Sequence, residues 1–355
     1  MLNDKDLFKK NDPDGMHELL ESFPSQLAEG RQLAHGADIG RIDTERVRNI
    51  VLCGMGGSAI GGDLIRAYGI DTLRVPFYIN REYRLPAFVG ANSLVIGSSY
   101  SGNTEETLSA FSEAEERGAQ LMAVTTGGEL GEKASRAGYP LVILPGGLPP
   151  RAALGYSFSP ILTLLENLGF FLDQTEFFDE TTRVLESGVK EYGLDEEWKI
   201  NTPKKNATVL HNSLPIIYTD DWLFNAAGVR FRGQINENAK QLAYSAVLPE
   251  NNHNELVGWN HLYALPGIIS AVFFDDKELH PRVRFRMEFL KNKVEELACD
   301  TTVFQSRGES RLARTFSLIQ LGDWTSYYLA MLNEEDPTPV EIIDTLKGAL
   351  AEFEG

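Results

Sequence analysis

The amino-acid sequence predicts an α/β protein of two tandem domains, each a mostly parallel sheet flanked by helices. Short, continuous apolar runs, typical of strands buried on both faces, alternate with amphipathic helical patterns. The same order of elements occurs twice, and 355 residues exceed the length of one typical core. The predicted division is an N-terminal helical arm at 1–45, a first domain at 46–190 and a second domain at 200–355.

The arm is predicted from helical spacing. Met16, Leu19, Leu20 and Phe23 recur at that spacing, and Pro24 interrupts the pattern. We expect this segment to pack against the domain that follows.

The first domain follows from residue 49. Its strands are predicted at 49–55, 75–79, 93–99, 120–126 and 140–146. Its helices are predicted at 58–69, 104–118 and 155–171, and Gly69 and Gly118 suit the two helix ends. A charged helix at 176–198 then leads to a polar, proline-containing boundary at 201–206.

The second domain repeats this rhythm. Its strands are predicted at 214–220, 245–250, 263–274 and 301–306. Its helices are predicted at 224–243, 281–297, 310–332 and 337–353.

The net charge excludes one class of partner. A formal charge of -18 repels nucleic acid, so no nucleic-acid partner is expected. Any anion site must then be built locally from backbone N–H groups, hydroxyls and a few cations. Arg230 and Arg232 are interpreted as ion-paired along their helix, and the arginines at 282, 284 and 286 as a solvated or interdomain face.

Composition also bears on location. Cys53 and Cys299 lie in apolar settings without a CxxC pattern, which indicates reduced core thiols and no metal site. The N-terminal segment has no apolar core of a signal peptide, and no apolar run approaches the length of a membrane span. A cytoplasmic protein with no membrane partner is expected.

A glycine-rich turn lies between the first predicted strand and helix. Residues 54–59, Gly-Met-Gly-Gly-Ser-Ala, satisfy the loose dinucleotide pattern G-x-G-x-x-G/A. That interpretation needs an acidic residue at the end of the next strand, where Asn80 and Arg81 stand, with Glu82 slightly beyond. The turn alone indicates an anion near a helix start or simply tight helix packing.

A second polar loop, at 98–104, follows the strand at 93–99. Its sequence, Ser-Ser-Tyr-Ser-Gly-Asn-Thr, has more short hydroxyls than helix capping requires. Hydroxyls and free helix N–H groups can satisfy the oxygens of a phosphate monoester. Phosphate-ester binding is therefore favoured over nicotinamide binding.

These two loops resemble the SIS (sugar isomerase) domain. The segments at 149–157, 233–241, 251–259 and 337–347 further resemble the bifunctional phosphoglucose/phosphomannose isomerases. The resemblance implies two SIS domains, a homodimer, no metal and no organic cofactor. It also implies interconversion of glucose 6-phosphate, and of mannose 6-phosphate, with fructose 6-phosphate through a cis-enediol(ate).

The resemblance also implies residue roles. The catalytic residues would be the base Glu237, the active-site arginine Arg151, a ring-opening histidine from the partner subunit, His253, and a lysine near the ring oxygen, Lys347. The phosphate would be bound by Gly57, Ser58, Ser99, Ser101 and Thr104.

The chemistry suits these residue types. One carboxylate can move a proton between adjacent carbons, a fixed cation stabilises the enediolate, and a histidine titrates near neutrality. Without the motifs, Glu237 and Lys347 would be interpreted as solvated helix residues, Arg151 as a helix cap, and a lone histidine as structural. Thr338 is a candidate for shaping the space around C2.

Two other functions share parts of this pattern. A sugar-phosphate-binding SIS regulator without turnover is the alternative, although such regulators carry a basic DNA-binding segment that this acidic chain lacks. The isomerase half of glucosamine 6-phosphate synthase would follow a glutaminase domain that begins with cysteine after Met1. Leu2 stands at that position here.

Overall fold

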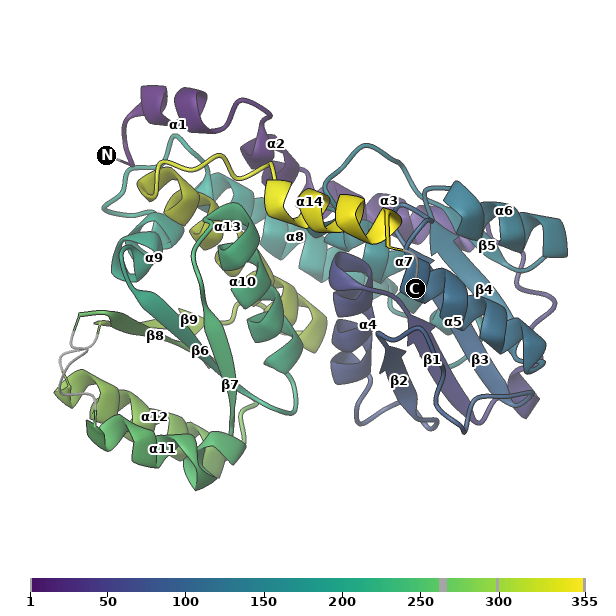
Figure 1. The fold of residues 1–355 in the computed structure, drawn as a ribbon. Helices are drawn as coiled ribbons and strands as arrows, with labels where there is room; N and C mark the ends of the chain where they lie inside the picture. Colours follow the sequence, from purple (N-terminus) through teal and green to yellow (C-terminus); the bar gives the residue numbers. More distant parts are fainter. Residues whose placement is uncertain (1, 262–266, 298–299, 354–355) are drawn as a thin grey trace.

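The computed structural model describes residues 2–261, 267–297 and 300–353, and it contains two parallel sheets flanked by helices (Figure 1). The first sheet has five strands in the order β2-β1-β3-β4-β5, and the second has four in the order β7-β6-β8-β9. Every pairing is parallel. The predicted fold class is confirmed.

The strands are β1 (Asn49–Cys53), β2 (Phe77–Asn80), β3 (Ser93–Ser99), β4 (Gln120–Thr125), β5 (Leu141–Ile143), β6 (Leu214–Asp220), β7 (Tyr244–Leu248), β8 (Ile269–Asp275) and β9 (Asp300–Gln305). The helices are α1 (Lys5–Asn11), α2 (Met16–Glu21), α3 (Phe23–His35), α4 (Gly56–Tyr68), α5 (Glu105–Glu116), α6 (Gly128–Ala137), α7 (Leu154–Asn167), α8 (Thr175–Tyr192), α9 (Thr202–Leu210), α10 (Asn225–Asn238), α11 (Glu255–Gly258), α12 (Pro281–Glu296), α13 (Arg311–Leu332) and α14 (Glu341–Ala351). Two short 3-10 helices matter for the site, η2 (Pro150–Ala152) and η3 (Glu250–His253).

The two sheets share one topology. In each, the first strand in sequence, β1 or β6, lies between the second strand and the third, and the fourth strand follows the third outward. The strands that lie inside the first sheet are apolar on both faces, and β3 is buried along its whole length. The recurring order of elements in the sequence therefore does reflect two similar halves.

Helix α13 joins the halves into one core. It is buried from Leu312 to Met331 and contacts α8, α9 and α10. Trp324 stacks on Tyr328 within it, with ring centroids 5.8 Å apart. A single hydrophobic cluster includes strand residues of both sheets, such as Leu52 and Phe273. A helix buried on all sides holds two sheets at once, which fixes the geometry between them.

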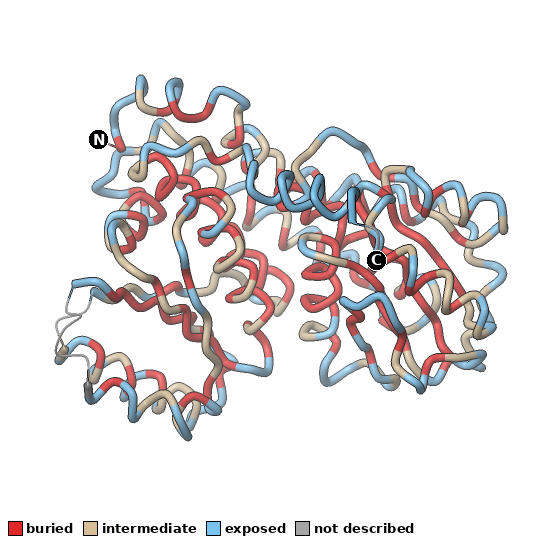
Figure 2. The backbone as a smooth tube through the Cα atoms, in the orientation of Figure 1, coloured by how far each residue is buried: buried red, intermediate tan, exposed pale blue. Residues whose placement is uncertain are grey.

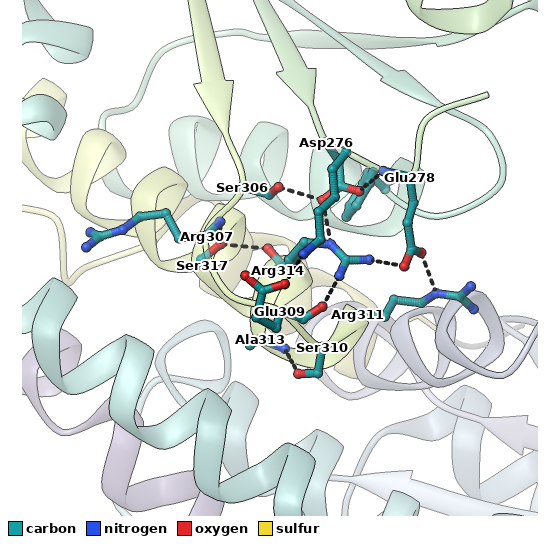
Figure 3. A network of polar contacts seen from close by, with 12 residues as sticks. Asp276, Glu278, Ser306, Arg307, Glu309, Ser310, Arg311, Ala313, Arg314 and Ser317 are labelled. Carbon is teal, nitrogen blue, oxygen red and sulfur yellow. Dashed lines mark hydrogen bonds and ion pairs between the residues drawn. The ribbon is translucent and has the colours of Figure 1, made fainter. Parts of the chain in front are cut away.

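A chain of ion pairs adds a polar link between the halves (Figure 3). Arg314, fully buried on α13, lies 2.8 Å from Asp276 and 2.7 Å from Glu278. Glu278 also pairs with Arg311 at 3.3 Å. Arg311 in turn binds Asp71, just beyond α4, through two contacts of 2.8 Å. The start of α13 is therefore tied to both halves.

Several predicted elements need correction. Helix α6 was not predicted, because residues 128–137 carry few apolar side chains. The polar segment at 201–206 is helical, since it forms the first turns of α9. Lys204 is fully buried there because its ammonium donates to the carbonyls of Leu194 and Glu196, at 2.9 and 2.7 Å. The interruption expected at Pro24 is found as a break at Ser22 between α2 and α3, and Pro24 occupies the first turn of α3, where its missing N–H costs nothing.

The helix predicted at 224–243 ends at Asn238, and the one predicted from 337 begins only at Glu341. The interpretation of Arg230 was also wrong. It pairs with Asp323 on α13 at 2.7 Å, both side chains being buried, instead of along its own helix. On α12, Arg284 pairs with Asp275 at 3.2 Å and Arg282 is exposed, which confirms a largely solvated face.

The predictions for the two cysteines, for the strand at 263–274 and for membrane spans have different outcomes. Cys53 is a buried free thiol whose pKa burial raises to about 12, which confirms a core residue, whereas Cys299 lies outside the described residues. The start of the strand predicted at 263–274 lies outside them as well. Among the helices of the described residues, none combines the length and apolarity that crossing a membrane requires.

The N-terminal arm is anchored to α13 by a buried carboxylate. Asp12 accepts from the backbone N–H of Met16 at 2.7 Å and from the hydroxyl of Tyr327 at 3.0 Å, and its Oδ2 lies 2.7 Å from Nδ1 of His17. Burial alone would raise the pKa of Asp12, but these hydrogen bonds outweigh it and lower the pKa. The hydrogen bond to Asp12 raises the pKa of His17. Helix α3 of the arm packs against α7 of the first half, which confirms the expected packing, and Asp12 adds an anchor to the second half.

This ion pair predicts a pH-dependent stability. A raised pKa of His17 means that its charged form stabilises the folded state fully below the unfolded pKa of about 6.5, and that this stabilisation is lost as pH rises through the folded-state value. We expect His17→Gln to lower the free energy of unfolding more at pH 6 than at pH 9, measured by urea denaturation. In an Asp12→Asn background this pH-dependent difference should vanish, and a loss independent of pH would contradict the role of the pair.

Candidate active site

The first predicted anion loop, residues 54–58, runs from β1 into α4. A Cβ on Gly57 would lie 2.7 Å from the carbonyl oxygen of Pro150, a distance that real Cβ atoms do not reach. Glycine therefore lets this loop touch η2. The N-cap of α4 is Met55, whose side chain has no oxygen, so its first-turn N–H groups receive no side-chain cap. An anion bound there would take up those donors.

The second loop, residues 99–104, runs from β3 into α5. The hydroxyls of Ser99 and Thr104 lie 2.9 Å apart, and Ser99 also accepts from the N–H of Gly102 at 3.1 Å. Gly102 has a φ of 72°, and a Cβ there would lie 1.9 Å from the carbonyl oxygen of Gly127. Thr104 is the N-cap of α5 but its hydroxyl makes no capping bond. The first turn of α5 is thus also open to a ligand.

The two loops meet because β1 and β3 are adjacent and parallel. A Cβ on Gly54 would lie 2.8 Å from the carbonyl oxygen of Ser98, and the N–H of Tyr100 donates to Ser58 at 3.2 Å. Ser101 is exposed nearby and accepts from Asn103 N–H at 3.2 Å. Two helix N-termini with their positive dipole ends therefore face one region, a suitable setting for an anion.

Arg151, in η2, continues from the first loop. Its side chain is only 6% exposed, and its Nε donates to Asn238 Oδ1 at 2.8 Å. One terminal nitrogen donates to the carbonyl of Thr338 at 2.7 Å and to that of Pro337. Burial lowers the pKa of Arg151, and Glu237 opposes this effect. The other terminal nitrogen is the one directed at Glu237.

Glu237 lies in the last turn of α10. Its Oε2 is 3.6 Å from Arg151, and its side chain is 36% exposed, so the carboxylate is held from one side and open on the other. The structure thus brings Glu237 and Arg151 together from opposite halves of the chain. Neighbouring Thr338 has a buried hydroxyl without a hydrogen-bond partner among the described residues. A ligand hydroxyl could satisfy it.

His253 does not join this group. It ends η3 and is exposed, and its side chain makes no hydrogen bond or ion pair within the described part of the chain. η3 contacts β7 and α11, and in Figure 1 α11 lies at the lower left, well away from α4, α5 and α14. Within one chain the histidine and the anion loops are therefore separated.

Lys347 is likewise unattached to the other predicted residues. It lies on α14, is exposed, and pairs with Asp344 on the same helix at 3.3 Å. Every described side chain of α14 is exposed, including Ile342 and Leu346, as the pale blue helix in Figure 2 illustrates.

The geometry weakens the dinucleotide interpretation. Asn80 ends β2 where a ribose-binding carboxylate would be required, and its amide donates to the carbonyl of Glu82 at 2.8 Å. Arg81, the next residue, pairs with Asp63. No group of histidine, cysteine and carboxylate side chains in the described ranges could hold a metal ion.

Two residues of the arrangement were missed in the sequence. Asn238 is buried and bridges Arg151 to Ser326, to which its amide donates at 3.0 Å. Lys240 donates to the carbonyls of Glu237 and Asp336, at 2.8 and 2.6 Å. Both lie in the segment 233–241 that carried the resemblance, and their closeness to Glu237 was the available signal.

Comparison with known proteins identifies the family. A model of the bacterial phospho-glucose isomerase C-terminal SIS domain matches residues 199–350. A bifunctional phosphoglucose/phosphomannose isomerase of Caldicellulosiruptor bescii is 42% identical over 338 residues, which cover 95% of this chain and 99% of that protein. The chain belongs to the bifunctional phosphoglucose/phosphomannose isomerase family. The resemblance inferred from the motifs is confirmed.

Other relatives agree. A bifunctional phosphoglucose/phosphomannose isomerase of Aquifex aeolicus is 35% identical across 87% of this chain and 92% of its own. Among solved structures, a hypothetical protein of Thermus thermophilus matches with a TM-score of 0.74 at 16% identity, covering 98% of this chain and 92% of that one. That likeness shows the fold. Members of the phosphoglucose/phosphomannose isomerase family are aldose–ketose isomerases.

The contact between Gly57 and Pro150 predicts a stability difference between two glycines. Gly57→Ala should lower the free energy of unfolding by about 1–3 kcal/mol, because its Cβ collides with backbone that cannot yield cheaply. Gly233→Ala on α10 is the matched control. Its Cβ meets nothing within 4 Å, so it should raise the free energy of unfolding by about 0.5–1 kcal/mol. Urea denaturation of both variants measures this, and equal effects would contradict the close approach.

Proposed function

We propose that this chain interconverts glucose 6-phosphate, and mannose 6-phosphate, with fructose 6-phosphate through a cis-enediol(ate), without a metal or organic cofactor. The observation that carries the proposal is the junction of the two halves. There, the anion loop at 54–58 touches η2 through Gly57, and Arg151 of η2 lies 3.6 Å from the carboxylate of Glu237. A phosphate site, a cation and a half-open carboxylate are what this reaction needs in one place.

In this proposal the phosphate binds at the starts of α4 and α5. Gly57, Ser58, Ser99, Ser101 and Thr104 would supply N–H and hydroxyl groups to its oxygens. The open N-termini of the two helices support the assignment, because they attract an anion in spite of the overall charge of -18.

Glu237 would then act on the sugar carbons. It takes the proton from C2 of the aldose while O1 gains a proton, and the enediol(ate) forms. The same carboxyl group then returns its proton to C1, while the O2 hydroxyl loses its proton, which balances the one that O1 gained, and the C2 carbonyl of the ketose forms. Arg151 would stabilise the charge that develops on the enediolate oxygen. Its burial strengthens this interaction, since the surrounding dielectric is low. Thr338, whose buried hydroxyl has no partner among the described residues, would shape the space around C2 and C3 of the sugar.

Ring opening needs a further proton transfer, from the O1 hydroxyl to the ring oxygen. We assign it to His253 of the partner subunit in a homodimer, with Lys347 near the ring oxygen. The exposure of His253 and its distance from the anion loops of its own chain support a role in a second active site.

Apolar side chains near η3 support the dimer. Arg286 of α12 donates to Asn252 of η3 at 3.3 Å, which places η3 beside that helix. Phe285 and Phe289, one turn apart on α12, are 68% and 54% exposed, and Val257 of α11 is 67% exposed. Such side chains gathered on one side of a protein are typical of an interface.

The proposal includes organisation and location. The sheets fall within 49–143 and 214–305, which supports domains at 46–190 and 200–355 after an arm at 1–45. The phosphorylated metabolites and the buried free thiol of Cys53 support a cytoplasmic location.

Turnover with EDTA present tests the proposal. Purified protein should convert glucose 6-phosphate and mannose 6-phosphate to fructose 6-phosphate. Glu237→Gln should lower kcat for both aldoses by about 10²–10⁴-fold, because the proton transfer loses its base. Binding of fructose 6-phosphate, measured by calorimetry, should persist because the phosphate loops are intact.

The same substitution at Glu186, an exposed residue of α8, is the control and should leave kcat unchanged. Full turnover by Glu237→Gln would remove Glu237 as the base. Tight binding of sugar phosphates without any turnover by the unaltered protein would favour the regulator instead.

Mixed dimers test the shared site. His253→Ala and Glu237→Gln dimers should each be inactive, but a dimer with one subunit of each kind has one intact site of its two. Random mixing makes about half of the dimers mixed, so about a quarter of the unaltered activity should return. No recovery in verified mixed dimers would place the whole site within one subunit.

A further inference from the structure

Three helices end at one polar cavity that Lys240 lines. α9, α10 and α13 each finish there, and the cavity has a volume of about 640 Å³. The residue after each helix cap, Asn212, Lys240 and Glu334, has a left-handed backbone with φ of 59°, 53° and 57°. No other non-glycine residue that the structure describes has positive φ. Backbone conformations of this kind cluster at functional sites.

The last carbonyls of a helix need hydrogen-bond donors, and its C-terminus is the negative end of the helix dipole. Three such ends meet at this cavity. The Asn333 amide donates to the carbonyl of Ala239 at 2.9 Å, and the Gln241 amide donates to those of Leu210 and Ser213, each at 2.8 Å. The ammonium of Lys240 is the cation of this group.

Lys240 ties the end of α10 to another segment. Its Nζ donates to the carbonyl of Glu237 at 2.8 Å, to that of Asn238 at 3.5 Å, and to that of Asp336 at 2.6 Å. The next two carbonyls along the chain, those of Pro337 and Thr338, both accept from Arg151. Three successive carbonyls are thus held by two cations, and both cations also contact Glu237.

The backbone at 240 would favour a different residue. The position after a helix cap in left-handed conformation is usually glycine, and a side chain there costs on the order of 1 kcal/mol. The three hydrogen bonds of the Lys240 ammonium offset this cost.

We propose that Lys240 is a positioning residue for the isomerase reaction, which fixes the backbone of Glu237 against the segment 336–338. The inference rests on the proposed function. It explains how α14 keeps a fixed position relative to Glu237 although its side chains are exposed. The segment that leads into α14 is attached at 336–338. Lys240 would touch no substrate and would act through the placement of Glu237 and Thr338.

Kinetics of Lys240→Gly test this role. Glycine relieves the left-handed backbone but removes the ammonium, so kcat should fall about ten- to hundredfold through misplacement of the base. The KM for fructose 6-phosphate should change less than threefold, because the phosphate loops belong to the first sheet. Lys240→Arg should recover kcat to within about fivefold of the unaltered enzyme, since a guanidinium can reach the same carbonyls.

Glu334→Gly is the matched control. It makes the same backbone change after α13 and removes only an exposed pair with Lys10, so kcat and KM should stay within twofold. A kcat of Lys240→Gly within twofold of the unaltered enzyme, or no recovery with arginine, would overturn the positioning role alone. No turnover by the unaltered enzyme would overturn the proposed function and this role together.

Discussion

The contact between Gly57 and η2 is the constraint on which the site depends. Because position 57 has no Cβ, the start of α4 lies against the carbonyl of Pro150, and the next residue, Arg151, enters the junction between the sheets. Arg151 then holds Asn238 of α10 and the segment before α14. The absence of a side chain at Gly57 thereby connects the anion loop at 54–58 to the carboxylate of Glu237, although that carboxylate belongs to the second half.

Charge is arranged locally in an acidic protein. The positive ends of α4 and α5 face one region, and Arg151 is buried beside it, while the remaining buried arginines are paired elsewhere. Arg230 is matched by Asp323 and donates to the carbonyl of Arg151 at 2.9 Å, so it supports Arg151 without competing for an anion. Breaking a buried pair of this kind leaves an uncompensated charge, so the loss of either partner would destabilise the junction.

The two parallel sheets, most strands and helices, and the loops at 54–58 and 99–104 could be predicted from the sequence, because apolar periodicity and glycine positions are local signals. Lys204 could not be predicted as buried, since its partners are carbonyls ten and eight residues earlier that only the fold brings to it. Lys240 was missed for a similar reason: its partner Asp336 is 96 residues away. Glu237 and Arg151 were singled out only through motif resemblance, because each alone has an ordinary surface interpretation.

The two halves differ in whether the backbone N–H groups after their strands are free to bind an anion. In the first, the loop after β1 leads into a helix start without a side-chain cap. The start of α10, after β6, also has no side-chain cap, but the carboxylate of Asp220 accepts from the N–H groups of Trp222, Leu223 and Phe224 that lead into it, at 3.0, 2.8 and 3.1 Å. After β8, Asp276 likewise accepts from Ser306 and Arg314. The second half therefore fills its own anion-binding positions with carboxylates. Its contribution to a site comes instead from the far end of α10, where Glu237 meets the first half.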